Sequence, residues 1–307
     1  IITLPYHRER KGPKEVSSVR FFGGTPAQNA RAFEQSGADV LRVVDWLQKE
    51  SPETVDKTRF GVVGISLGAI VAHLAMGRDR RIAVGVAALG SGDLADLYRS
   101  SLLVKILHRQ HPVPPIRSEK DFLPLLPADP LTYADRNRPR NVLMIQAARD
   151  LFIPPRDTTR LWRALGEPPI QWLDINHFAL SLVPDQLMRS TLSWFEQAWA
   201  QGSETRPTGV PDISVPTLKF GTVALIGGDG HVVVTPAVQW QFHTFAKRRD
   251  HMSLLHLNAG ISDRGALVGA GLTVNAFVDV GLMSRVPLTR LPSSLPFRPY
   301  LSLHVVY

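Results

Sequence analysis

The 307-residue chain has a formal net charge of +8, contains no cysteine and is 44% hydrophobic. This length and composition exclude an overall disordered chain and suit one large or two ordinary domains. No apolar run approaches the roughly 20 residues of a membrane-spanning helix, which excludes a helical membrane protein. Without cysteine there is no disulfide framework or thiol chemistry, so the compartment, cytoplasm or cell envelope, stays open.

The basic surplus is scattered along the chain and does not form one stripe. Its tightest clusters are Arg78, Arg80 and Arg81, and Lys247, Arg248 and Arg249. No zinc-ligand spacing, recognition helix or aromatic RNA-binding motif accompanies these clusters. We therefore expect no nucleic-acid partner.

The first 200 residues alternate between short strand-like runs and helix-like stretches, a pattern typical of a parallel sheet with crossover helices. The chain opens at Ile1 with neither Met nor a signal-like segment, so we expect a fragment or a processed product. The predicted strands are 1–4, 60–65, 82–89, 142–146 and 170–173. The predicted helices are about 22 residues from Thr25, then 67–76, 156–165 and 184–200.

Two segments interrupt this alternation. Residues from about 93 to 138 are rich in Pro, Leu, Phe and His, and we expect an insertion that covers or shapes a site. Residues 201–216 lack periodicity and indicate a linker. The predicted organisation is therefore an α/β domain over 1–200, a linker over 201–216 and a β-rich domain over 217–307.

The C-terminal region is predicted to be all strand. GTVALIGGDGHVVVT has the signature of a hairpin. The run from Leu267 to Met283 alternates with period two throughout, which predicts one long strand. YLSLHVVY places Leu301, Leu303, Val305 and Tyr307 on one face. This pattern is typical of outer-membrane barrel strands, although about six strands are fewer than the eight of the smallest such barrel. A soluble β-domain, packed on itself or on the first domain, is the alternative.

Gly64-Ile65-Ser66-Leu67-Gly68 matches G-x-S-x-G. Alone the motif is weak, because one chance match is expected in roughly one such sequence in ten. Here an apolar strand precedes Ser66 and a helix follows it, the setting of a nucleophile elbow. We interpret both glycines as allowing the close approach of strand and helix. The Leu67 N–H, at the helix N-terminus, is a candidate oxyanion donor.

A serine nucleophile needs a histidine base and an orienting acid. Asp150 follows the strand 142–146, and His177 follows the strand 170–173, one strand-helix-strand step later. Both side chains would emerge at the carboxyl edge of the sheet. Asp93 and Asp174 are alternative acids. Ser91 is expected to be a loop residue.

With these motifs, residues 1 to about 200 resemble the α/β-hydrolase fold. They are most similar to bacterial dienelactone-hydrolase-like esterases and to the α/β-hydrolase domain-containing 18 family. The residues that carry this likeness are LPYH, VVDWL, GISLG, DPLTYA, ARDLFIPP and INHFAL. The resemblance implies Ser66 as nucleophile, Asp150 as acid and His177 as base of an acyl-enzyme mechanism.

The resemblance also implies a second oxyanion donor in the loop Pro5-Tyr6-His7-Arg8, from the backbone N–H groups of His7 and Arg8. Many relatives have Gly where this chain has Arg8. If Ile1 opens the strand before this loop, one or two strands that normally precede it are missing, and the sheet is expected to have an open edge.

No nucleotide-binding glycine motif is present, and His108 and His111 lack a carboxylate partner, so we expect neither cofactor nor metal. The sequence predicts a serine hydrolase that cleaves carboxylic esters, with a small-molecule or lipid ester as substrate. The alternative is a catalytically degenerate hydrolase domain joined to a surface or membrane-associated β-domain over 217–307.

Overall fold

The computed structural model describes residues 1–50, 55–138, 140–201, 207–286 and 297–306. Contacts between Cα atoms divide the chain into two units. The first unit comprises Ile1–Gln146, Leu151–Gln171 and Asp185–Asp212. The second comprises Ala147–Asp150, Trp172–Pro184 and Ile213–Tyr307.

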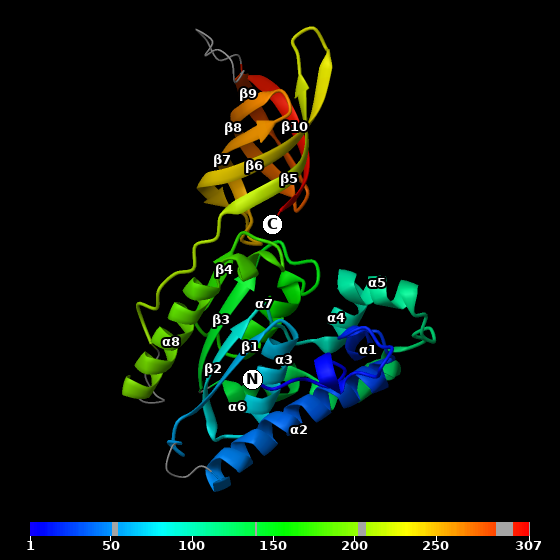
Figure 1. Cartoon of the computed structure of the whole chain (residues 1–307), viewed down its shortest axis with the longest axis vertical. Helices are drawn as coiled ribbons and strands as arrows, with labels where there is room; N and C mark the ends of the chain where they lie inside the picture. Colours follow the sequence, from blue (N-terminus) through cyan, green and yellow to red (C-terminus); the bar gives the residue numbers. More distant parts are fainter. Residues whose placement is uncertain (51–54, 139, 202–206, 287–296, 307) are drawn as a thin grey trace. The chain divides into compact units, whose positions relative to one another are not determined.

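The first two thirds of the chain contain a four-stranded β-sheet with helices packed on it (Figure 1). Its strands are β1 (Phe60–Ile65), β2 (Ile82–Ala88), β3 (Asn141–Ala147) and β4 (Ile170–Leu173), in the order β1-β2-β3-β4. β1 pairs with β2, and β2 with β3, in parallel. β2 and β3 are almost wholly buried, as expected for a parallel sheet covered on both faces. The predicted α/β-hydrolase fold class is confirmed.

The main helices agree with the predicted ones within about three residues. They are α2 (Pro26–Glu50), α3 (Leu67–Arg78), α7 (Pro155–Ala164) and α8 (Pro184–Gln201), and α1 (Val19–Phe22) is a single turn. The start of α2 is fixed by Thr25, whose hydroxyl accepts the N–H of Gln28 while the Gln28 side chain accepts the N–H of Thr25. None of the helices in the described parts of the chain is long and apolar enough to cross a membrane.

Two glycines in neighbouring strands show which helices cover the sheet. A Cβ at Gly61 would meet Phe195 and Trp199 of α8, whereas a Cβ at Gly85 would meet Met76 of α3. Gly85 pairs with the residue after Gly61, so the two glycines face opposite sides. α3 and α8 therefore cover opposite faces, and the core of Phe21, Phe33, Ile70, Leu74 and Met144 lies around α3.

The expected strand at residues 1–4 is wrong, because these residues are not in a strand. Their carbonyl groups are engaged in turns instead. Leu4 O accepts the N–H of His7 at 3.2 Å, and Thr3 O accepts from the Arg10 side chain at 2.8 Å. The prediction relied on a short apolar run bounded by turn residues, and these turn contacts compete with sheet pairing.

The segment 93–138 folds into short helices. These are α4 (Leu94–Ser100), α5 (Leu102–Gln110), η2 (Glu119–Ala128), η3 (Pro130–Tyr133) and α6 (Ala134–Asn137), and a further single turn, η1 (Arg8–Arg10), lies near the start of the chain. Asp129 connects the segment, because its carboxylate accepts the N–H groups of Asp93 and Leu94 and also that of Leu131. The proline-rich sequence therefore becomes an ordered insertion between β2 and β3.

In the part of the chain described after residue 216, six antiparallel strands close into a barrel in the order β10-β5-β6-β7-β8-β9. They are β5 (Thr217–Ile226), β6 (Val232–Lys247), β7 (Ser253–Ser262), β8 (Gly265–Asn275), β9 (Val278–Val286) and β10 (Arg298–Val306) (Figure 1). The predicted hairpin is confirmed, since β5 pairs with β6 across the turn at Gly227–Gly230. We refer to β5–β10 as the β-domain.

The single long strand expected over Leu267–Met283 is wrong, because the chain turns at Ala276 and Phe277 and forms the hairpin of β8 and β9. The side-chain oxygen of Asn275, Oδ1, accepts the N–H of Phe277 at 2.8 Å, which stabilises the turn. Because the register shifts between Thr273 and Asn275, even-numbered residues of β8 pair with even-numbered residues of β9. Even-numbered residues therefore lie on the same face in both strands. Period two therefore continues through the turn, and the alternation alone could not reveal it.

Polar residues fill much of the inside of the β-domain, and apolar side chains point outward. Lys219, His256, Asn258 and Asp279 are fully buried. Trp240, by contrast, is 52% exposed. The alternative in which the apolar face packs on itself is therefore wrong for these strands.

Candidate active site

Ser66 lies between β1 and α3 in a strained turn. Its backbone has φ 55° and ψ −118°, in a region that residues with a Cβ rarely adopt. The N–H of Ser66 donates to Ala88 O at the end of β2, at 2.8 Å, and Ser66 O accepts the first bond of α3, from Ala69. Such strain is costly and is a feature of strand-turn-helix elbows that expose a nucleophile.

The two glycines of the motif differ in their surroundings. A Cβ at Gly64 would overlap the carbonyl group of Gly68 and lie 2.5 Å from Ala69 N. A Cβ at Gly68 would meet no atom within 4 Å. Close approach of strand and helix therefore requires only Gly64, and the steric reason predicted for Gly68 is wrong.

The first turn of α3 provides backbone N–H groups beside Ser66. Leu67 is the first residue of α3, and the opening N–H groups of a helix have no acceptor within the helix. Together with the helix dipole, they favour negative charge at this end. This geometry suits the predicted role of the Leu67 N–H as an oxyanion donor.

The N–H groups of His7 and Arg8 donate to other acceptors in this structure. The His7 N–H donates to Leu4 O at 3.2 Å, and the Arg8 N–H donates to Ser17 Oγ at 3.2 Å. Tyr6 and Arg8 both have positive φ, 61° and 44°, so the loop is strained. The oxyanion role of His7 and Arg8 stays a prediction, and it requires these two hydrogen bonds to be exchanged.

Asp150, which is buried, and His177, which is partly buried, form a hydrogen-bonded pair in the second unit. His177 Nδ1 donates to Asp150 Oδ2 at 2.7 Å, and the Asp150 side chain is only 2% exposed. The His177 ring also contacts Phe178 edge-on, with centroids 5.6 Å apart. A carboxylate in this position fixes both the orientation and the tautomer of the imidazole.

The two alternative acids have other partners. Asp174 accepts from Arg149 Nε at 2.8 Å, from the N–H of Ser253 at 3.0 Å and from the Ser253 hydroxyl. Asp93 binds the side chain of Arg160 and accepts the N–H of Asp96. The pairing of His177 with Asp150 is thus separate from both of these carboxylates.

Sequence reasoning missed the residues that hold the His177 loop. Asn176 accepts the N–H groups of Phe178 and Ala179, at 2.9 and 3.1 Å, and its amide donates to Val306 O. Arg149 and Asp174 form an ion pair whose side chains are 1% and 9% exposed. An Asn directly before the histidine is a signal of an Asx turn, but the partners of Asp174 lie too far away in sequence to be anticipated.

Other candidate residues have no catalytic setting. Ser91 is fully buried. The His108 ring contacts the Tyr98 ring in a tilted arrangement, with ring centroids 4.8 Å apart. Across the described residues, no group of three or more His, Cys, Asp or Glu side chains is arranged to hold a metal ion.

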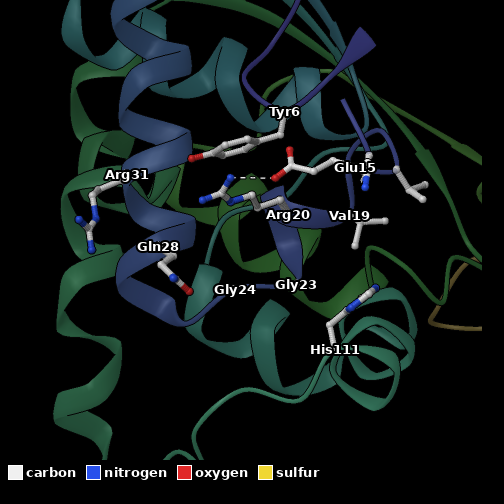
Figure 2. A pocket seen from close by; sticks show the side chains of 11 residues that line it. Tyr6, Glu15, Val19, Arg20, Gly23, Gly24, Gln28, Arg31 and His111 are labelled. Atoms are coloured by element: carbon white, nitrogen blue, oxygen red, sulfur yellow. Dashed lines mark hydrogen bonds and ion pairs between the residues drawn. The ribbon is translucent and has the colours of Figure 1, made fainter. Parts of the chain in front are cut away.

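A cavity of about 560 Å³ lies among the N-terminal loop, α1, the start of α2 and His111 (Figure 2). Within it, the Arg20 guanidinium binds Glu15 at 2.8 Å and lies 5.0 Å from the centre of the Tyr6 ring. Neither Ser66, Asp150 nor His177 lines this cavity. A shallower hollow of about 830 Å³ lies within the insertion, around Tyr98, Ile116 and Phe122. We assign no substrate role to either.

The parallel sheet, its covering helices and the strand-turn-helix at Ser66 define the fold as that of the α/β-hydrolases. A family model then gives the finer assignment: that of the prolyl oligopeptidase family of peptidases matches residues 30–186, just over half of the chain. The chain belongs to this family. The predicted α/β-hydrolase resemblance is thereby confirmed.

Individual relatives are more distant. A Mycobacterium tuberculosis protein, "Uncharacterized protein MT2702" in strain CDC 1551 / Oshkosh, is 26% identical over 178 residues, which are 57% of this chain and 40% of that protein. This chain therefore covers well under half of the relative's length. Among solved structures, a puromycin hydrolase has 22% identity, covers 62% of this chain and 29% of its own, and has a TM-score of 0.45. The Pyrococcus horikoshii acylaminoacyl peptidase has 17% identity, with 60% of this chain and 31% of the peptidase covered, and its TM-score is also 0.45.

Proposed function

We propose that the protein cleaves carboxylic esters through an acyl-enzyme, with Ser66 as nucleophile, His177 as general base and Asp150 as the orienting acid. Ser66 Oγ attacks the ester carbonyl carbon while His177 Nε2 takes the hydroxyl proton. The tetrahedral intermediate expels the alcohol, which receives that proton. Water, deprotonated in turn by His177, then releases the carboxylic acid and restores Ser66.

The observation that carries the proposal is the bond between His177 Nδ1 and the buried Asp150 carboxylate. Because Nδ1 donates to Asp150, Nε2 is the ring nitrogen that can accept the serine proton. Asp150 also stabilises the imidazolium formed after that transfer. The strained backbone of Ser66 is independent support, since such strain persists at sites where function requires it.

The oxyanion donors favour an ester over a peptide bond as substrate. The N–H groups of His7 and Arg8 are engaged elsewhere, which leaves the Leu67 N–H, at the first position of α3, as the candidate donor. Loss of one oxyanion donor slows acyl transfer by about 10²–10³-fold. An ester has a better leaving group than an amide, so ester cleavage tolerates weaker oxyanion stabilisation. Peptide cleavage, suggested by the family, is the competing substrate class.

The test uses a fluorophosphonate probe and p-nitrophenyl esters of increasing acyl length, on wild type, Ser66→Ala and Ser91→Ala. We expect labelling and ester hydrolysis in wild type and Ser91→Ala, and neither in Ser66→Ala. Labelling that persists in Ser66→Ala would refute Ser66 as the nucleophile. No labelling of folded wild type would favour the degenerate hydrolase domain.

The substrate class is tested with matched p-nitrophenyl esters and p-nitroanilides that carry the same acyl group. We expect the ratio of kcat/KM for the ester to kcat/KM for the anilide to be well above the ratio of their uncatalysed hydrolysis rates. Preference for the anilide or for a peptide would overturn the ester assignment while leaving the Ser66 mechanism intact. The acyl length that reacts fastest distinguishes a small-molecule ester from a lipid ester.

A further inference from the structure

The outer face of the β-domain is apolar on all six strands. Strand pairing places a large apolar side chain outward on each strand, and each of these is 45% or more exposed: Phe220, Trp240, Ile261, Leu272, Leu282 and Leu303. Within the described strands, the polar outward positions are few, among them Thr222, His243 and Ser284, and the one Lys in such a position, Lys247, is the last residue of β6.

The inside of the same domain holds the charges and many of the amides. Lys219 Nζ donates to Asp279, and His256 lies 3.1 Å from Lys219 Nζ and 3.4 Å from Asp279. Gln239 donates to Ser302 at 3.0 Å. In water, folding normally places apolar groups inside and polar groups outside, so this domain has the reverse arrangement.

Further charged residues of the β-domain lie at the two ends of the strands. Lys247, Arg248 and Arg249 lie at the turn between β6 and β7, and Asp263 and Arg264 lie between β7 and β8. Along β8, the outward residues from Ala266 to Val274 cover roughly 27 Å of strand, or about 20 Å of height at an ordinary barrel tilt. This height is close to the apolar band of about 25 Å on lipid-facing barrels.

We propose that the outer face of the β-domain contacts lipid and inserts into the hydrocarbon of a bilayer. A protein partner on one side would leave the outward residues of the other strands in water, because the barrel is closed. Only a medium that surrounds the domain covers all six strands. The basic turn at Lys247–Arg249 then lies where anionic lipid headgroups would bind it.

The experiment uses the full chain purified in detergent and mixed with vesicles of phosphatidylcholine containing a minor share of phosphatidylglycerol. We expect co-flotation that withstands high salt. We also expect brominated acyl chains to quench tryptophan fluorescence, and this quenched component to disappear in Trp240→Phe but to remain in Trp199→Phe, the control on α8.

A second pair of variants tests the apolar band. Leu303→Arg places a charge on an outward position, and we expect it to lower the vesicle partition coefficient by about tenfold or more. Asp263→Asn changes the net charge by the same amount in a turn and should leave partitioning unchanged.

Three results would overturn the proposal. One is a detergent-free wild-type monomer or discrete oligomer that does not float with vesicles. Another is flotation abolished by high salt, which would show headgroup adsorption only. The third is flotation without quenching of Trp240. Because the quenching comparison uses a conservative substitution, it holds even if Leu303→Arg fails to fold.

Discussion

Replacing the two glycines of the elbow separately should have opposite effects on stability. In Gly64→Ala the new Cβ would overlap the carbonyl group of Gly68 and lie 2.5 Å from Ala69 N, whereas real Cβ contacts stay above 3.0 Å. Because the Gly68 carbonyl oxygen lies closer still than Ala69 N, β1 and α3 must separate by about 1 Å. In a close-packed interior an inserted methyl group costs typically 1–3 kcal/mol, and backbone is harder to displace than a side chain, so we expect about 3 kcal/mol.

Gly68→Ala is the matched control, because its Cβ would meet no atom within 4 Å. Alanine is also the better helix former, so we expect a gain of up to about 0.5–1 kcal/mol. Urea unfolding measures both effects. With a slope of about 3 kcal/mol per molar urea, the midpoint should fall by roughly 1 M in Gly64→Ala and stay or rise in Gly68→Ala.

The same variants report on the geometry of Ser66. A displacement approaching 1 Å can reduce reactivity about 10²-fold, so fluorophosphonate labelling of folded Gly64→Ala should be slower by that order. Equal urea midpoints for Gly64→Ala and wild type would refute the steric argument. A loss of stability in Gly68→Ala as large as in Gly64→Ala would refute the distinction between the two glycines.

Two further predictions concern buried carboxylates. In Asp150→Asn we expect kcat for ester hydrolysis to fall by about 10³–10⁴-fold with the urea midpoint little changed, because His177 loses the acceptor that fixes its tautomer. Activity within tenfold of wild type would exclude Asp150 as the acid. Asp174→Asn is the control, and it should act mainly on stability. Burial, together with the hydrogen bond to Asp96 and its negative charge, raises the pKa of Asp157 to about 8. The folded state thus holds a proton that the unfolded state releases near pH 4, so this group makes the free energy of unfolding fall between about pH 4 and pH 8. In Asp157→Asn the free energy of unfolding, measured with urea, should lack that slope and should exceed the wild-type value at pH 8 by at least about 1 kcal/mol. Parallel curves of unfolding free energy against pH for the two proteins would contradict this.

Much of the α/β fold is predictable from local patterns. β1 and β4 have the predicted bounds, and the four main helices begin within about one residue of their predicted starts. Where an element is short and buried, its apolar run and the turn residues beside it are enough to predict its bounds. The strand expected at residues 1–4 failed because strand formation depends on a partner, which one sequence does not reveal.

The β-domain shows a different limit. Alternation identified the strands but not the turn at Ala276 and Phe277, because the pairing around it preserves the alternation. Nor could alternation decide which face points inward, since period two is the same for either face. Closure of six strands determines that Lys219 and Asp279 are inside.

The candidate site was predictable as residue types in chain order, but not as a set of contacts. Sequence spacing left Asp93, Asp150 and Asp174 as acids for His177. Their partners separate them: Asp93 binds Arg160, Asp174 binds Arg149 and Ser253, and Asp150 binds His177. These contacts depend on residues up to 79 positions apart, which no local pattern encodes.

The supports of the His177 loop set a boundary for protein engineering. Asp174 accepts the N–H of Ser253 and its main-chain oxygen accepts from Thr217, while Asn176 donates to Val306 O. All three partners lie beyond residue 186, where the family match ends. A fragment trimmed to the matched residues would therefore lose anchors on both sides of the histidine. The stretch that the family model matches is thus shorter than the stretch that must be expressed to hold the pair of Asp150 and His177 in place.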